Sequence, residues 1–144
     1  MDMLNKIGLF SLLLMCLLSC NKQEEKVENL KNEILSIHDE VMPLMGEIKE
    51  DQRKLLEKSS ALFLQDSVGN EKKILELNEI ADRLDKAYES MFVWMRQYKV
   101  DFEGMKDEEV IAYLEEQKIK VSKVNEDITQ ALSDAKKQQT GSGD

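Results

Sequence analysis

The sequence predicts an all-α protein, an elongated antiparallel three-helix bundle with coiled-coil-like packing. Three observations favour this fold class. Apolar residues recur at steps of three and four along three long segments, which is the spacing of one face of an α-helix. The chain contains one proline and six glycines, so helix breaks are few. The long alternating runs of Val, Ile or Thr that mark strands do not occur in the sequence.

Residues 1–19 resemble the signal peptide of a bacterial lipoprotein. Lys6 precedes an apolar run, residues 7–18, which is shorter than the roughly 20 residues that span a bilayer. The run leads into Cys20, with a leucine three positions before it and Ser19 directly before it, and this pattern is similar to a lipobox. The resemblance implies that the signal is removed after Ser19 and that Cys20 is acylated, with palmitate among its acyl chains.

Acylation of Cys20 would make the membrane a partner of the chain and place the protein in the cell envelope, on the periplasmic side or at the cell surface. Cys16 lies in the segment that is removed, so the mature chain would retain Cys20 alone and form no internal disulfide. Residues 20–26 are polar and are expected to form a lipid-anchored tether.

The helical bundle is expected over residues 27–138. Its first helix is the longest and is predicted to run to about Asp66. Pro43 lies inside this helix and should kink it, because proline lacks the N–H that a helix interior requires. The apolar stripe of this helix comprises Val27, Leu30, Ile34, Ile37, Val41, Leu44, Ile48 and Leu55.

Two further helices are expected, separated by short turns that make neighbours in the chain antiparallel. Residues 67–70 form the first turn, and Gly104 and Asp107 bracket the start of the third helix. Residues 139–144 are predicted to be a disordered tail. The stripe of the second helix comprises Ile74, Leu77, Ala81, Leu84, Tyr88, Met91, Met95 and Tyr98. The stripe of the third comprises Val110, Leu114, Gln117, Val121, Val124, Ile128, Ala131 and Ala135.

The charge of the chain argues against nucleic-acid binding. Asp and Glu number 29 against 20 Lys and Arg, for a net charge of −9, and such a surface repels phosphates. The chain also offers one histidine only and no glycine-rich phosphate loop. A ferritin-like di-iron site would require two Glu-x-x-His motifs. We therefore expect a protein that is not an enzyme.

One set of residues could carry chemistry. A hairpin that turns near Val68 should bring the segment around the sole histidine to the segment around the sole tryptophan, with Met45 opposite Met91 and His38 opposite Tyr98. Thioether and imidazole ligands together suit Cu(I), a soft ion. The candidate metal ligands are His38, Met42, Met45, Met91 and Met95, supported by Trp94 and Pro43.

The alternative is structural packing. Met91 and Met95 lie in the middle of an apolar stripe, and methionine fills irregular gaps such as the one a proline kink creates. A half-buried histidine that bonds a carboxylate or Tyr98 is ordinary in a helical core. On this interpretation the chain needs no cofactor, and Cu(I) is the alternative.

The two segments are also similar to stretches in a group of small, uncharacterised Bacteroidota lipoproteins. Their recurring features resemble His-Asp-Glu-x-Met-Pro, here residues 38–43, and Met-x-x-Trp-Met, here residues 91–95. Members are sometimes labelled "viral A-type inclusion protein". The resemblance supports a lipoprotein and names no substrate.

Together these features predict a lipid-anchored, non-enzymatic helical protein of the cell envelope with a scaffold or partner-docking role. Its partners would be the membrane, through the lipid on Cys20, and either an envelope protein or further copies of itself, because apolar stripes of this kind also drive self-association. The alternative function is that of a periplasmic Cu(I)-binding protein that uses the His/Met cluster.

Overall fold

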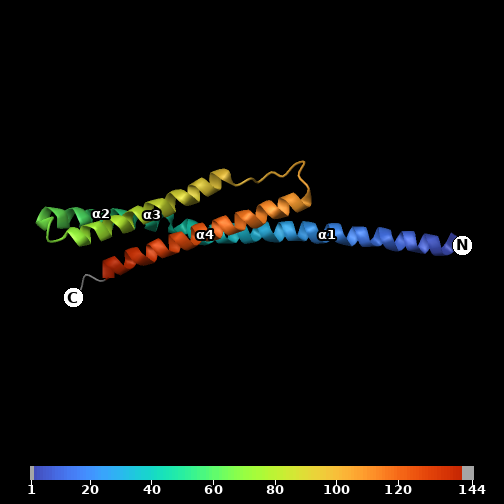
Figure 1. Ribbon diagram of the computed structural model, residues 1–144, viewed down its shortest axis with the longest axis horizontal. Coiled ribbons are helices and arrows are strands. Elements are labelled where there is room, and N and C mark those ends of the chain that lie inside the picture. The colour runs from blue at the N-terminus through green and yellow to red at the C-terminus, as the bar shows by residue number, and fades with distance from the viewer. Residues whose placement is uncertain (1, 141–144) are drawn as a thin grey trace.

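A computed structural model describes the backbone of residues 2–140 and the side chains of residues 22–139. Throughout the described backbone the chain is helical, apart from its turns (Figure 1). The elements are α1 (Asp2–Val41), the short 3-10 helix η1 (Met42–Leu44), α2 (Met45–Asp66), α3 (Glu71–Gln97) and α4 (Asp107–Thr140). Because α1, η1 and α2 together form the first and longest member, the predicted all-α three-helix bundle is confirmed.

The three members of the bundle are α1 with η1 and α2, then α3, then α4, and they run up, down and up. Figure 1 shows that α3 returns alongside α2 and that α4 then runs in the same direction as α1. Ion pairs between the first and third members follow the same order, since Glu33 pairs with Lys118 at 2.8 Å and Glu47 pairs with Lys136 at 2.8 Å. Helices that are neighbours in the chain are therefore antiparallel, and the first and third members are parallel.

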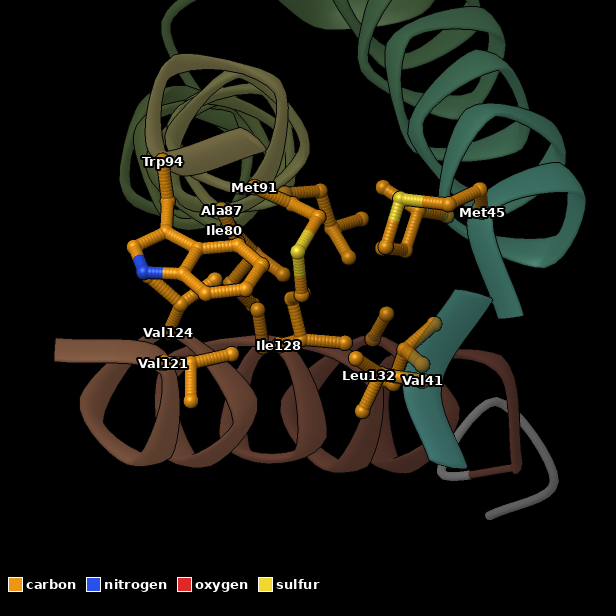
Figure 2. Close-up of a cluster of buried hydrophobic side chains, with 14 of the residues drawn as sticks. Val41, Met45, Ile80, Ala87, Met91, Trp94, Val121, Val124, Ile128 and Leu132 are labelled. Carbon is orange, nitrogen blue, oxygen red and sulfur yellow. The ribbon is translucent and has the colours of Figure 1, made fainter. Parts of the chain in front are cut away.

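The core follows the predicted stripes in most positions, and it also includes residues outside them, namely Met45, Ile80, Ala87, Trp94 and Leu132. Its members occupy positions three and four apart on each helix, so each helix turns one apolar face inward. Side chains with less than 2% of their surface exposed include Ile34, Val41, Ile48, Leu55, Leu77, Leu84, Met91, Leu114, Val121 and Ile128. Figure 2 shows Met91 and Trp94 reaching from α3 toward Val121 and Ile128 on α4, with Met45 entering from α2.

The predicted kink at Pro43 is confirmed. α1 ends at Val41, and η1 replaces the α-helical turn that contains the proline. Pro43 has no N–H to donate to the carbonyl of Asp39, which removes one rung of an α-helix. The chain tightens instead, with the N–H of Met45 bonded to the carbonyl oxygen of Met42. Pro43 itself is exposed, so its effect on the fold acts through the backbone.

The two ends of the chain differ in part from expectation. Residues 20–26, expected as a tether, belong to the continuous helix α1, which projects beyond the start of α4 (Figure 1). The side chain of Cys20 lies outside the described residues. At the other end α4 reaches Thr140, and residues 141–144 of the expected tail are also outside the described part of the chain.

Among the described residues, no helix is both long enough and apolar enough to cross a bilayer.

Candidate functional site

His38 and Met95 face each other across the bundle. His38 lies in the last turn of α1 and Met95 lies near the end of α3. The Nε2 atom of His38 is 3.2 Å from the Sδ atom of Met95. The prediction that His38 lies opposite Tyr98 is therefore wrong by about one helical turn, although the two predicted segments do meet.

Asp39 determines which nitrogen of His38 carries the proton. Nδ1 of His38 lies 2.8 Å from Oδ1 of Asp39. An ionised carboxylate only accepts hydrogen bonds, so we assign the proton to Nδ1. In the neutral ring Nε2 is then an acceptor. It presents a lone pair to the thioether of Met95, which has lone pairs but no proton to donate.

Trp94 closes one side of this contact. Its ring centroid lies 5.9 Å from that of His38, and its side chain is 6% exposed. The indole N–H donates a hydrogen bond to Oε1 of Gln117 on α4, at 3.1 Å. Gln117 is only 4% exposed, so this bond satisfies two polar groups inside the core and fixes the plane of the indole.

A series of aromatic rings continues from Trp94 toward the loop between α3 and α4. Tyr98 lies 5.1 Å from Trp94 and 6.3 Å from Tyr113, measured between ring centroids, and Tyr113 lies 5.7 Å from Phe102. Burial raises the pKa of the Tyr98 phenol, and Tyr113 adds to the effect. The Tyr113 hydroxyl accepts the backbone N–H of Lys99 at 2.7 Å. The rings therefore attach the connecting loop to α4.

The remaining candidate ligands take packing positions. Met91 is fully buried and Met45 is 8% exposed, both in the main core. Met42 lies in η1, half-buried against the same core. Among the polar contacts of the described side chains, His38 is joined to Met95 and to no other candidate methionine. The structure thus brings together His38, Met95 and Trp94 out of the predicted set.

Sequence reasoning missed the aromatic and amide partners of this site. Gln117 interrupts the apolar stripe of the third helix, and a buried glutamine among apolar residues signals a polar partner in the core. Tyr113 lies four residues before Gln117, on the same face of the helix. Neither signal identifies the partner, because the register of α4 against α3 depends on the loop between them.

Open grooves lie elsewhere on the described surface. One, of about 320 Å³, runs between α3 and α4 beside Arg83, Lys86 and Asp127. Another, of about 630 Å³, lies between α1 and α4 beside Leu30 and Ile119. Among the described side chains, no three His, Cys, Asp or Glu residues are grouped closely enough to hold a metal ion.

The chain was compared with protein families, curated proteins and solved structures. No family model matches the chain, and no curated protein or solved structure matches it either.

Proposed function

We propose that the chain is a lipid-anchored, non-enzymatic helical protein of the cell envelope that serves as a scaffold or docks a partner. One observation supports the docking role above the others. Large apolar side chains are exposed in and beside the turn from α2 to α3, with Leu64 85% and Val68 83% exposed, and Phe63 and Leu75 are exposed as well. We refer to Phe63, Leu64, Val68 and Leu75 as the tip residues.

The tip residues are at the opposite end of the molecule from the N-terminal projection of α1 (Figure 1). From residue 20 to residue 66 the helical rise amounts to on the order of 70 Å. Several large apolar side chains exposed at one end of a helical hairpin are the kind of feature that serves as an interaction surface. An acyl group on Cys20 would hold the other end of the helix, so the tip residues would reach a partner well away from the membrane.

The anchor is tested by replacing Cys20 with serine. In the native cell, the protein with its native sequence should lose residues 1–19, incorporate a fatty-acid probe and sediment with membranes. The Cys20→Ser variant should remain uncut and unlabelled. The Cys16→Ser variant, a matched control, should behave as the protein with its native sequence. Labelling of the Cys20→Ser variant would contradict acylation at this residue.

The docking role is tested by photo-crosslinking from the tip. A photoreactive amino acid in place of Leu64 should give a discrete adduct, either with one envelope protein or with a second copy of this chain. The same amino acid in place of Glu89, which is exposed on α3, should not. If both positions give the same pattern of adducts, or Leu64 gives none, the tip residues are not a docking surface.

A further inference from the structure

We propose that His38 and Met95 form a two-ligand site for a soft monovalent metal ion, Cu(I), beside the ring of Trp94. This inference goes beyond the anchoring and docking proposed above and is independent of them. It depends on the facing pair of donor atoms, Nε2 of His38 and Sδ of Met95, which are 3.2 Å apart.

With the ring neutral and its proton on Nδ1, the contact between Nε2 and Sδ contains no hydrogen to share. Nδ1 of His38 donates to Asp39, so Nε2 in the neutral ring has a lone pair and no proton. The thioether of Met95 also offers lone pairs only. Two electron donors therefore face each other in a half-buried position, and a cation that both can bind is the partner that satisfies them.

The donors lie close enough to share one ion after a small movement. With bonds of ~2.0 Å to nitrogen and ~2.3 Å to sulfur, as at zinc sites, the present 3.2 Å separation corresponds to an angle of about 95° at the ion. Two-ligand Cu(I) and Ag(I) prefer a linear arrangement, with donors ~4.3 Å apart, so His38 and Met95 would move apart by about 1 Å on binding.

Asp39 and Trp94 complete the surroundings. A histidine that binds a metal usually donates its other ring N–H to a carboxylate, which orients the ring and strengthens the metal-binding nitrogen, and Asp39 occupies that position. The Trp94 ring lies 5.9 Å from the His38 ring. A cation held by His38 would lie close to the indole, whose π-electrons attract cations over about this distance.

The ligand types determine the metal. A thioether is a soft ligand that favours Cu(I), whereas Zn²⁺ and Mg²⁺ prefer several nitrogen, thiolate or oxygen ligands. Ag(I) has the same charge and is also soft, and it does not change oxidation state, so it is a suitable probe. We expect the site to bind Ag(I) and Cu(I) and to leave Zn²⁺ unbound at equal concentration.

The test uses the full chain with Cys16→Ser and Cys20→Ser, because thiolates would otherwise bind the probe more tightly than the proposed site. The protein is titrated with Ag(I) in chloride-free buffer and in mild detergent. Fluorescence of Trp94, the single tryptophan, reports an ion near the indole, and nuclear magnetic resonance of the His38 ring reports its coordination. We expect one ion per chain, with both signals changing together.

Variants identify the ligands. Met95→Leu and His38→Gln should each weaken Ag(I) binding at least tenfold. Met105→Leu, in the loop between α3 and α4, and Met91→Leu, in the core, should leave it unchanged. Methionine-to-leucine changes nearly conserve volume, and circular dichroism verifies that each variant keeps its helicity.

Three results would overturn the site. They are no response of Trp94 to Ag(I), unchanged affinity in the helical Met95→Leu variant, and a loss in Met91→Leu equal to that in Met95→Leu. The last result would show that Met91, in the core, contributes to binding as much as Met95 does.

Discussion

At the residue scale, the bond between Trp94 and Gln117 joins α3 to α4 inside the core. Both side chains are nearly fully buried, and the 3.1 Å bond satisfies the indole N–H and the amide oxygen together. A buried polar group that loses its partner costs more free energy than the bond itself contributes. The pair therefore favours one packing arrangement of α4 over others that bury the same apolar surface.

Removing one member of this pair should be costly. Gln117→Leu leaves the Trp94 N–H without a partner, and we expect the free energy of unfolding to fall by roughly 1–3 kcal/mol. The double variant Trp94→Phe/Gln117→Leu should lose less than the sum of the two single changes, because the second change removes the orphaned group. Urea unfolding followed by circular dichroism measures each value. Gln97→Leu, at an exposed position, is the control, and strict additivity would show that the bond does not couple the two residues.

Asp85 should give the molecule part of its sensitivity to acid. The hydrogen bond from Lys49, at 2.7 Å, and one from Gln52 lower the pKa of Asp85 below its usual 3.8. A carboxylate with a lowered pKa in the folded state stabilises the fold at neutral pH, and this contribution is lost as the pH falls from about 4 through the lowered value. Both partners are more than a third exposed, so the contribution is only about 0.5 kcal/mol.

This prediction is checked by comparing the free energy of unfolding at pH 7 and pH 3. Asp85→Asn should lower stability more at pH 7 than at pH 3, and 1 M salt should reduce the difference. Equal losses for Asp85→Asn at both pH values would mean that the charge of Asp85 does not stabilise the fold.

At the scale of the helices, two glycines should respond oppositely to alanine. Gly104 has a φ of +79° in the loop before α4, a conformation that L-residues avoid, so Gly104→Ala should cost roughly 1–2 kcal/mol. Gly46 lies in the first turn of α2 with nothing within 4 Å of an added Cβ. Gly46→Ala should therefore stabilise by roughly 0.5 kcal/mol through helix propensity. Thermal unfolding distinguishes the two, and a destabilised Gly46→Ala would contradict the open environment of that residue.

The helices could be predicted from the sequence because their signals are local. The end near Asp66, the break at Pro43 and the start at Asp107 each depend on residues within one or two turns. The pairing of His38 was predicted less well, since it lies opposite Met95 and not Tyr98.

The partner of Trp94 could not be predicted for a related reason. Gln117 has a recognisable place in the stripe of α4, but which residue of α3 it meets depends on the path of residues 98–106. That path is determined by tertiary contacts, such as the bond from the backbone of Lys99 to the Tyr113 hydroxyl. Sequence periodicity carries no information about contacts of this kind.

At the scale of the whole molecule, the packed core begins well inside α1. The first buried side chains described are Leu30 and Ile34, which are 7% and 0% exposed. The N-terminal part of α1 extends past the start of α4 (Figure 1). Lys26 reaches Glu115 at 2.7 Å, but both side chains are about half exposed, so this ion pair adds little stability. The projecting part of α1 can therefore serve an anchor without being needed for the fold.

Two truncations separate these regions. A chain that begins at residue 22 keeps every described core residue, and its midpoint of urea unfolding should match that of the full chain. A chain that begins at residue 36 lacks Leu30 and Ile34 and should lose roughly 3–6 kcal/mol, at about 1.5–3 kcal/mol for each buried aliphatic side chain. Circular dichroism during urea titration measures both. If the chain beginning at residue 36 were as stable as the full chain, the packing of α1 against α4 would not stabilise the bundle. If the chain beginning at residue 22 were instead much less stable, the residues removed from α1 would belong to the folded unit. Their removal would then have broken contacts that stabilise the bundle.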